Sequence, residues 1–128
     1  MHVSIDTFSG FLCASAHTEA TKDVLNHSLY AFSVMGQPKI IKTDNGPGYS
    51  SLKFKQFCAQ LQIKHITGIP YNPLGQGIVE RAHQTLKNTL TKLGAQETIY
   101  PEFSLQHHKR RKQRKRSEFI LYKYSKVG

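Results

Sequence analysis

The sequence predicts an α/β fold in which helices cover a small mixed sheet. Short β-branched segments alternate with longer segments of helical periodicity, and clusters of glycine, proline and asparagine separate them. The expected order is strand, strand, helix, strand, helix, strand, loop, helix. A chain of 128 residues is long enough for one domain, but an apolar content of 38% predicts a modest core.

The first two strands are expected in "HVSIDTFSGFLCASAH", residues 2–17, where polar and apolar residues alternate. Ser9-Gly10 supplies a tight turn between them. A helix follows, with Thr18 or Thr21 as its cap and Gly36 as its stop. Helical spacing predicts one buried stripe on this helix, formed by Val24, Leu25, Leu29, Phe32 and Met35.

Two more short strands are expected at "KIIKT", residues 39–43, and "IKHIT", residues 63–67. Ser50 or Ser51 can cap the helix between them. The apolar positions of that helix follow the i, i+3, i+4, i+7 pattern and are Phe54, Phe57, Cys58 and Leu61.

The segment "GIPYNPLGQG", residues 68–77, is rich in turn-forming residues and is expected to be a mobile loop. A third helix is predicted from about Gln76 to Leu93. Its apolar stripe consists of Val79, Ala82, Leu86, Leu90 and Leu93. Its opposite face carries Gln76, Glu80, His83 or Gln84, and Lys87.

The region after residue 93 shows no clear period, and "SEFILYKYSKVG" at its end could be a strand or a stray apolar end. The net charge of +10 divides into +4 for residues 1–93 and +6 for residues 94–128. Seven of the nine basic residues after position 93 lie in "KRRKQRKR", residues 109–116. We expect residues 94–128 to form an unrelated, disordered basic tail. Its natural partner is a polyanion such as DNA or RNA, and the alternative is a solvated tail without a dedicated partner.

Targeting signals are not evident in the sequence. It contains no run of eighteen apolar residues and no basic region ahead of an apolar stretch at its start, which predicts no membrane span and no signal peptide. Cys13 and Cys58 are isolated cysteines, which favours a reducing compartment. A nuclear or cytoplasmic location is therefore expected, rather than secretion.

Two carboxylates are candidates for a functional site. Asp44 ends a β-branched run and precedes Asn45-Gly46, which by itself is typical of an Asx turn. Glu80 lies on the polar face of the third helix, which by itself is typical of a solvated surface. The Gly/Pro segment between them leads into the helix that bears Glu80. The alternative to an Asx turn and a solvated surface is therefore that Asp44 and Glu80 form a functional pair.

The stretches "IKTDNGPGYSSLKFKQF" and "HITGIPYNPLGQGIVERAHQTLK" resemble the catalytic core of retroviral integrases, most of all those of betaretroviral and related endogenous elements. The resemblance covers roughly residues 2–93. It implies a ribonuclease H-like mixed sheet flanked by helices, with the first strand and the last helices missing from this chain. The implied activity is DNA integration by metal-dependent phosphodiester transfer, at a site where two Asp and one Glu bind two Mg²⁺ (or Mn²⁺) ions.

The resemblance assigns roles to individual residues. Asp44 corresponds to the second catalytic, metal-binding carboxylate and Glu80 to the third, which agrees with the preference of hard cations for carboxylate oxygens. Asn45, Gln76 and Lys87 match family positions near DNA. The basic residues of the tail are expected to bind DNA as well: Lys109, Arg110, Arg111, Lys112, Arg114, Lys115 and Arg116.

The chain departs from the family pattern at the first carboxylate. The segment Ile5–Phe11 matches the second strand of the family, so the first metal-binding Asp is expected to fall before Met1. Asp6 can replace it only if its side chain points into the cleft. With Asp44 and Glu80 alone, we expect weak metal binding and little or no catalysis by this chain.

Further departures affect DNA contact and assembly. "ERAHQTLK" has His83 and Gln84 where the family commonly has Asn and a basic residue. Family members oligomerise, but most of that surface has no match here. Two alternatives to an enzyme domain therefore stay open. One is a non-catalytic remnant that binds nucleic acid through its basic tail. The other is an unstable fragment in which the edge of a strand is left unpaired.

Overall fold

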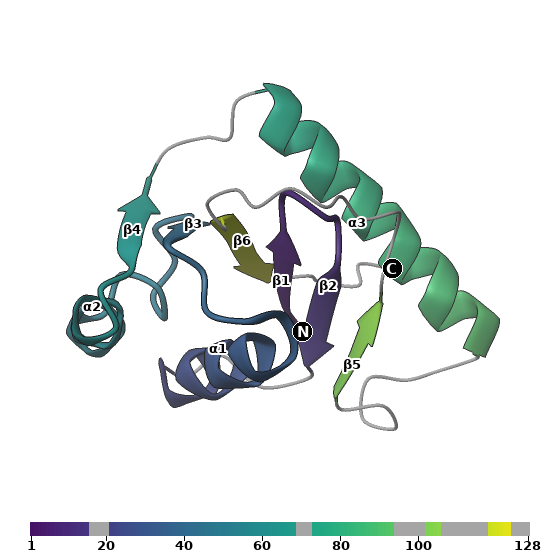
Figure 1. The fold of residues 1–128 in the computed structure, drawn as a ribbon. Coiled ribbons are helices and arrows are strands. Elements are labelled where there is room, and N and C mark those ends of the chain that lie inside the picture. The colour runs from purple at the N-terminus through teal and green to yellow at the C-terminus, as the bar shows by residue number, and fades with distance from the viewer. Residues whose placement is uncertain (16–20, 69–72, 94–101, 106–117, 124–128) are drawn as a thin grey trace.

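The computed structural model describes residues 1–15, 21–68, 73–93, 102–105 and 118–123. In order along the chain, the elements are β1 (His2–Asp6), β2 (Leu12–Ser15), α1 (Thr21–Met35), β3 (Ile40–Thr43), α2 (Leu52–Gln60), β4 (Lys64–Thr67), α3 (Pro73–Leu93), β5 (Glu102–Leu105) and β6 (Glu118–Lys123). The strands form one sheet in the order β4-β3-β6-β1-β2-β5, and helices cover both of its faces (Figure 1). The predicted α/β class with a mixed sheet is confirmed.

The first two strands form the predicted hairpin. β1 and β2 pair antiparallel, with His2 opposite Ser15 and Ile5 opposite Leu12. The amide of Gly10 donates to the carbonyl oxygen of Asp6 at 2.8 Å and closes the turn. Gly10 has φ +81°, a conformation that favours glycine.

Strands β3 and β4 are parallel neighbours that are connected through α2. Their register runs from Ile40 opposite Lys64 to Thr43 opposite Thr67, so both strands end at the same edge of the sheet. Asp44 and Gly68 directly follow the two strand ends. Parallel pairing therefore brings two segments together that are far apart in the sequence.

The central position of the sheet belongs to a segment near the end of the chain. β6 pairs antiparallel with β1, from His2 opposite Lys123 to Asp6 opposite Phe119, and parallel with β3. In Figure 1 it lies between β3 and β1. The sequence predicts that a strand edge stays unpaired, because the first strand of the family is missing. In the structure, β6 pairs with that edge of β1.

The expectation of a disordered tail does not hold for the two strands of residues 94–128 that the structure describes. β6 is ordered because Phe119, Ile120, Leu121 and Tyr122 are all buried, with exposed fractions of 7% or less. β5 pairs antiparallel with β2 at the edge of the sheet. The basic run 109–116 lies outside the described residues, so the expectation for it stays a prediction.

The apolar core has two parts, one on each face of the sheet. α3 packs on the face formed by residues of β1, β2 and β6: Val3, Ile5, Leu12, Ala14, Ile120 and Tyr122. α1 and α2 cover the other face, in a cluster formed by Val24, Ile41, Tyr49, Phe54, Cys58, Ile63, Phe119 and Leu121. Alternate residues of β6 therefore contribute to both parts.

The buried face of α1 differs from the predicted stripe. Leu29 is 53% exposed, whereas His27 and Ser28 are buried. His27 is buried because its ring contacts two hydroxyl groups: Nε2 lies 2.6 Å from Ser4 Oγ, and Nδ1 lies 2.7 Å from Ser15 Oγ. The helix ends at Met35, and Gly36 has the predicted left-handed conformation with φ +91°.

Helix α2 begins as predicted, because the Ser51 side chain caps it by accepting from the amide of Phe54 at 3.2 Å. Helix α3 begins at Pro73, three residues before the expected Gln76, so residues 73–77 are helical and not loop. Proline is compatible with a first helical turn, where its missing N–H has no partner to lose. The expected mobility of residues 69–72 lies outside the described part of the chain.

Candidate functional site

Asp44 lies in a turn at the edge of the sheet where β3 and β4 end. It is exposed, and its Oδ1 accepts a hydrogen bond from the amide of Gly46 at 2.7 Å, which makes an Asx turn. A Cβ atom at Gly46 would lie 2.9 Å from that same oxygen, so the turn needs glycine there. The ordinary structural role of Asp44 is therefore present in the fold, and its second oxygen remains a candidate ligand.

Asn45 connects this turn to the segment that follows β4. A Cβ atom built on Gly68 would lie 2.9 Å from Asn45 Nδ2, so the amide side chain packs on the bare backbone of Gly68. Gly68 also has φ +73°, a second reason for glycine. The turn with Asp44 thus lies beside the start of the connection from β4 to α3, the helix that bears Glu80.

Helix α3 presents the predicted polar face to solvent. Gln76, Glu80 and Lys87 are all exposed, while Ala82, Leu86 and Leu90 are buried against the sheet. Gln84 belongs to the exposed face and donates to Asn88 Oδ1 at 3.1 Å. The side chain of Leu93, the last member of the predicted stripe, lies outside the described part of the chain.

His83 belongs to the side of α3 that faces the sheet. Its Nδ1 lies 3.2 Å from the hydroxyl oxygen of Tyr122 on β6, and the two rings stack with centroids 5.1 Å apart. Burial lowers the pKa of His83 and favours the neutral ring. The middle of α3, one turn after Glu80, is therefore fixed against the central strand by a contact that the sequence pattern did not predict.

His65 is a second histidine near the site that was not among the predicted site residues. Thr43 Oγ1 donates to the carbonyl oxygen of Asp44 at 2.9 Å and lies 2.9 Å from His65 Nε2. Because the hydroxyl proton is used, we assign the Nε2–H tautomer to His65. Burial, and then the charge of Lys55, lower the pKa of His65. The ring lies edge-on to Phe54 with centroids 4.9 Å apart, which keeps it beside the end of β3.

Asp6 is engaged in the hairpin between β1 and β2. Its Oδ1 accepts from the amide of Phe8 at 3.0 Å, and its Oδ2 accepts from the Ser9 hydroxyl at 3.1 Å. Both carboxylate oxygens thus have partners within four residues of the chain. This arrangement supports a structural role for Asp6 and gives no indication that it replaces a metal ligand.

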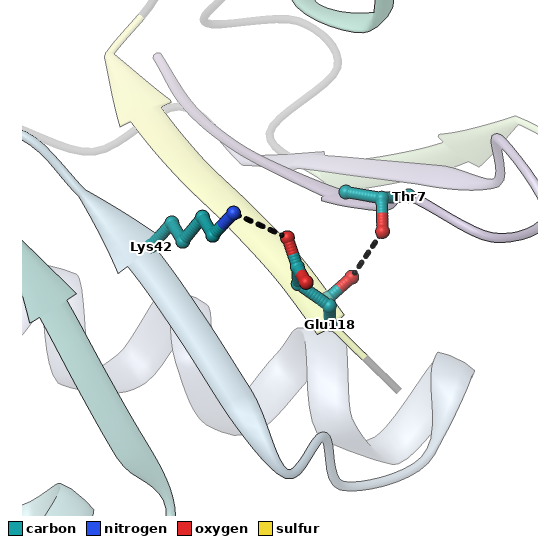
Figure 2. A network of polar contacts seen from close by, with 3 residues as sticks. All are labelled: Thr7, Lys42 and Glu118. Carbon is teal, nitrogen blue, oxygen red and sulfur yellow. Dashed lines mark hydrogen bonds and ion pairs between the residues drawn. The ribbon is translucent and has the colours of Figure 1, made fainter. Parts of the chain in front are cut away.

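Glu118 is the carboxylate that β6 carries, and it forms an ion pair. Its Oε2 lies 3.0 Å from Lys42 Nζ, and its carbonyl oxygen accepts from Thr7 Oγ1 at 3.2 Å. Figure 2 shows both contacts. Glu118 is opposite Ile40, the first residue of β3, whereas Asp44 follows the last residue of that strand. The Glu118 backbone is therefore at the other end of the strand pair from Asp44.

The oxygen donors suit a hard cation, but their number falls short. Within the described residues, no three His, Cys, Asp or Glu side chains gather closely enough to hold a metal ion. Asp44 and Glu80 have the right chemistry for Mg²⁺, yet two carboxylates do not make the three-carboxylate, two-ion arrangement implied by the resemblance. The side chains that the structure describes therefore do not fit that two-ion site.

Comparison with known proteins assigns the family. The integrase core domain model matches residues 1–73, and the chain belongs to this family. It is 67% identical over 94 residues to the Gag-Pro-Pol polyprotein of Mason-Pfizer monkey virus, which covers 73% of this chain and 5% of that polyprotein. It is 58% identical over 93 residues to a Pol-related polyprotein of a mouse intracisternal A-particle, covering 72% of this chain and 11% of that protein.

A solved structure agrees with the assignment. The magnesium complex of the HTLV-2 integrase catalytic core in its dimeric form superimposes with a TM-score of 0.61 at 36% identity, and the match covers 71% of this chain and 57% of that one. The fold is the ribonuclease H-like one of retroviral integrase cores. No helix within the described ranges is long and apolar enough to cross a membrane.

Proposed function

We propose that this chain is an integrase core whose family activity is DNA integration by metal-dependent phosphodiester transfer, and that the 128-residue chain by itself does not catalyse it. The family match supports the first part, together with Asp44 and Glu80 at the positions where the resemblance places two of three catalytic carboxylates. The shortage of clustered metal-binding side chains among the described residues supports the second part.

The central strand carries the main argument against catalysis. β6 lies beside β3, the strand that leads to Asp44, so its last residues are nearest to the expected metal site. Leu121 and Tyr122, which follow Ile120 in the pairing with β3, offer no carboxylate, and neither does the final residue, Lys123. The one carboxylate of the strand is paired with Lys42 at the other end. A divalent ion at Asp44 and Glu80 would lack a shared third ligand, so we expect Mg²⁺ or Mn²⁺ to bind weakly.

A strand-transfer assay tests this proposal. The purified chain is incubated with labelled donor DNA, a target duplex and either Mg²⁺ or Mn²⁺, with Glu80→Gln and Asp44→Asn prepared in the same way. We expect no metal-dependent product above that of the two variants. Strand transfer by the unmodified chain that Glu80→Gln abolishes would contradict the inactive assignment, and the paired variants remove any contribution from a contaminating nuclease.

We also propose a non-catalytic alternative, in which the chain binds nucleic acid through its basic run and the exposed polar face of α3. The observation that favours it is the density of charge: seven of the eight residues 109–116 are Lys or Arg. Lys87 is exposed on α3 and would add a phosphate contact. Asn45 and Gln76, like Lys87, match positions that the resemblance places near DNA. Such a run is also typical of a nuclear localisation signal.

The salt dependence of binding separates the two proposals. Affinity for duplex DNA and for single-stranded RNA is measured over a range of salt for the unmodified chain, for Glu80→Gln, and for a variant with Gln at all seven basic positions of 109–116. We expect a steep slope that survives Glu80→Gln and that decreases, on duplex DNA, by roughly 0.9 for each phosphate that the basic run neutralises. An unchanged slope in the neutralised variant would contradict a role for the basic run.

A further inference from the structure

β6 is the element that joins the two halves of the sheet. β4 and β3 lie on one side of it and β1, β2 and β5 lie on the other, and β3 and β1 are not hydrogen-bonded neighbours. Without β6, the sheet would therefore divide into a two-stranded part and a three-stranded part, each with a newly unpaired edge. Figure 1 shows the strand lying between the two groups.

The space between β1 and β3 is specific for an extended strand. One edge of β6 pairs antiparallel with five residues of β1, and its other edge pairs parallel with three residues of β3. A segment in this slot must therefore present backbone donors and acceptors on both edges, as in strand addition to an open sheet. The mixed pairing also fixes the direction in which the segment can enter.

A strand in this slot must carry apolar side chains on both faces of the sheet, because each face is covered by a part of the core. Phe119 and Leu121 belong to the core under α1 and α2, and Ile120 and Tyr122 belong to the core under α3. Each is at most 7% exposed. A strand with one solvated face alternates buried and exposed residues, so four consecutive buried residues mark this segment as part of both cores.

The link between the strand and the rest of the fold is long compared with the distance it must cover. Residues 106–117 connect β5 to β6, and the two strands are separated in the sheet by β2 and β1. Adjacent strands lie about 4.8 Å apart, and a chain extends by roughly 3.3 Å per residue, so twelve residues are more than enough. The contacts that hold β6 in place are thus set by its own pairing and packing and need no tension in the link.

We propose that the slot between β1 and β3 is a strand-binding site, and that residues 118–123 are its resident ligand. The ligand class is a short extended peptide that presents apolar side chains on both of its faces. The remainder of the chain therefore binds this segment after the covalent connection is cut. This inference is independent of metal binding and of activity.

Cutting the connection in the intact chain tests the proposal. The recognition sequence of a specific protease replaces residues 109–116 at equal length, the chain is purified and cleaved, and mass spectrometry verifies the cut. If the folded chain resists the protease, the two pieces are made separately, mixed in denaturant and refolded together. We expect the pieces to elute together in size exclusion and to melt cooperatively, at a temperature that falls on dilution because the melt has become bimolecular.

A labelled synthetic peptide of residues 117–128 provides the second readout. We expect it to exchange into the cleaved complex with saturable binding, and we expect the same peptide with Ile120→Pro not to bind, since proline removes a ladder hydrogen bond from a central strand. A matched peptide with Glu118→Gln should lose little affinity, since water screens the ion pair of Glu118 with Lys42. Separation of the pieces under native conditions would overturn the proposal, whether the large piece then stays folded or unfolds. Equal binding of the proline peptide would overturn it as well.

Discussion

Lys42 Nζ lies 3.0 Å from Glu118 Oε2, and this ion pair joins β3 to the first residue of the central strand (Figure 2). Both side chains are about one-third exposed, at 33% and 28%, so water screens the pair. We expect Glu118→Gln to lower the free energy of unfolding by at most about 1 kcal/mol. Urea denaturation measures this, and a loss of several kcal/mol would show that the ion pair, and not apolar packing, holds β6.

Phe119 follows Glu118 in β6 and is fully buried in the core under α1 and α2. Removal of a buried aromatic side chain leaves a cavity, so Phe119→Ala should cost about 3–5 kcal/mol. Because this can exceed the stability of a small domain, Ile120→Val serves as the mild companion, with an expected loss of about 0.5–1.5 kcal/mol. Unfolding midpoints in urea give both values. Losses near zero for both variants would mean that β6 is not part of the core.

His27 forms a buried bridge between β1 and β2, because its two ring nitrogens lie within hydrogen-bonding distance of Ser4 and Ser15. Ser4→Ala removes one hydrogen-bond partner of a buried polar ring, which should cost about 1–3 kcal/mol. Ser33→Ala is a matched control, since the Ser33 hydroxyl is exposed and donates to the Tyr30 carbonyl oxygen in the preceding turn. Equal unfolding free energies for the two variants would argue against the bridge.

His65 and His83 make stability depend on pH. Both have a pKa below the ordinary value of 6.5, so the folded chain favours the neutral rings while the unfolded chain takes up protons. The stabilisation is complete above pH 6.5 and is lost progressively as the pH falls below it. We expect the melting temperature of the unmodified chain to drop between pH 7.5 and 5.5. In a double variant that combines His65→Gln and His83→Asn, the drop should be smaller. An unchanged pH profile in the double variant would show that other groups control it.

Metal ions should stabilise the chain only weakly. A ligand that binds the native state raises the melting temperature once its concentration exceeds its dissociation constant. With two carboxylates as ligands, we expect an effect of Mg²⁺ or Mn²⁺ only at millimolar concentrations, and none in Asp44→Asn. The Asp44 turn tolerates this change because an Asn side-chain oxygen can still accept from the Gly46 amide. Stabilisation by micromolar metal would indicate a complete site and would contradict the inactive assignment.

Features set by neighbouring residues could be predicted from the sequence. The Ser51 cap, the left-handed Gly36 and the stripe of Ala82, Leu86 and Leu90 depend on local propensity and helical spacing, and the structure contains all of them. The start of α3 was misplaced because a turn-rich segment hides a proline that suits a first helical turn.

Features that depend on distant contacts could not be predicted in the same way. Residues 118–123 contain an apolar run that follows a dense basic segment. The neighbouring residues do not determine whether such a run pairs with other strands of a sheet. The burial of His27 depends on Ser4 and Ser15, hydroxyl groups from two strands that precede α1. For the candidate site, the helical spacing predicted the exposed face of α3, but it gave no sign of the contact between His83 and Tyr122. The assignment of Asp44 and Glu80 as site residues stays a prediction.

Amide hydrogen exchange on the intact chain tests the central claim, that a segment near the end of the chain is the middle strand of an integrase core. We expect the amides of residues 119–121 to exchange as slowly as those of Val3, Ile5 and Ile41, because all belong to one cooperative sheet. Fast exchange at residues 119–121, while Val3 and Ile5 stay protected, would show a sheet that is stable without β6 and would contradict this account.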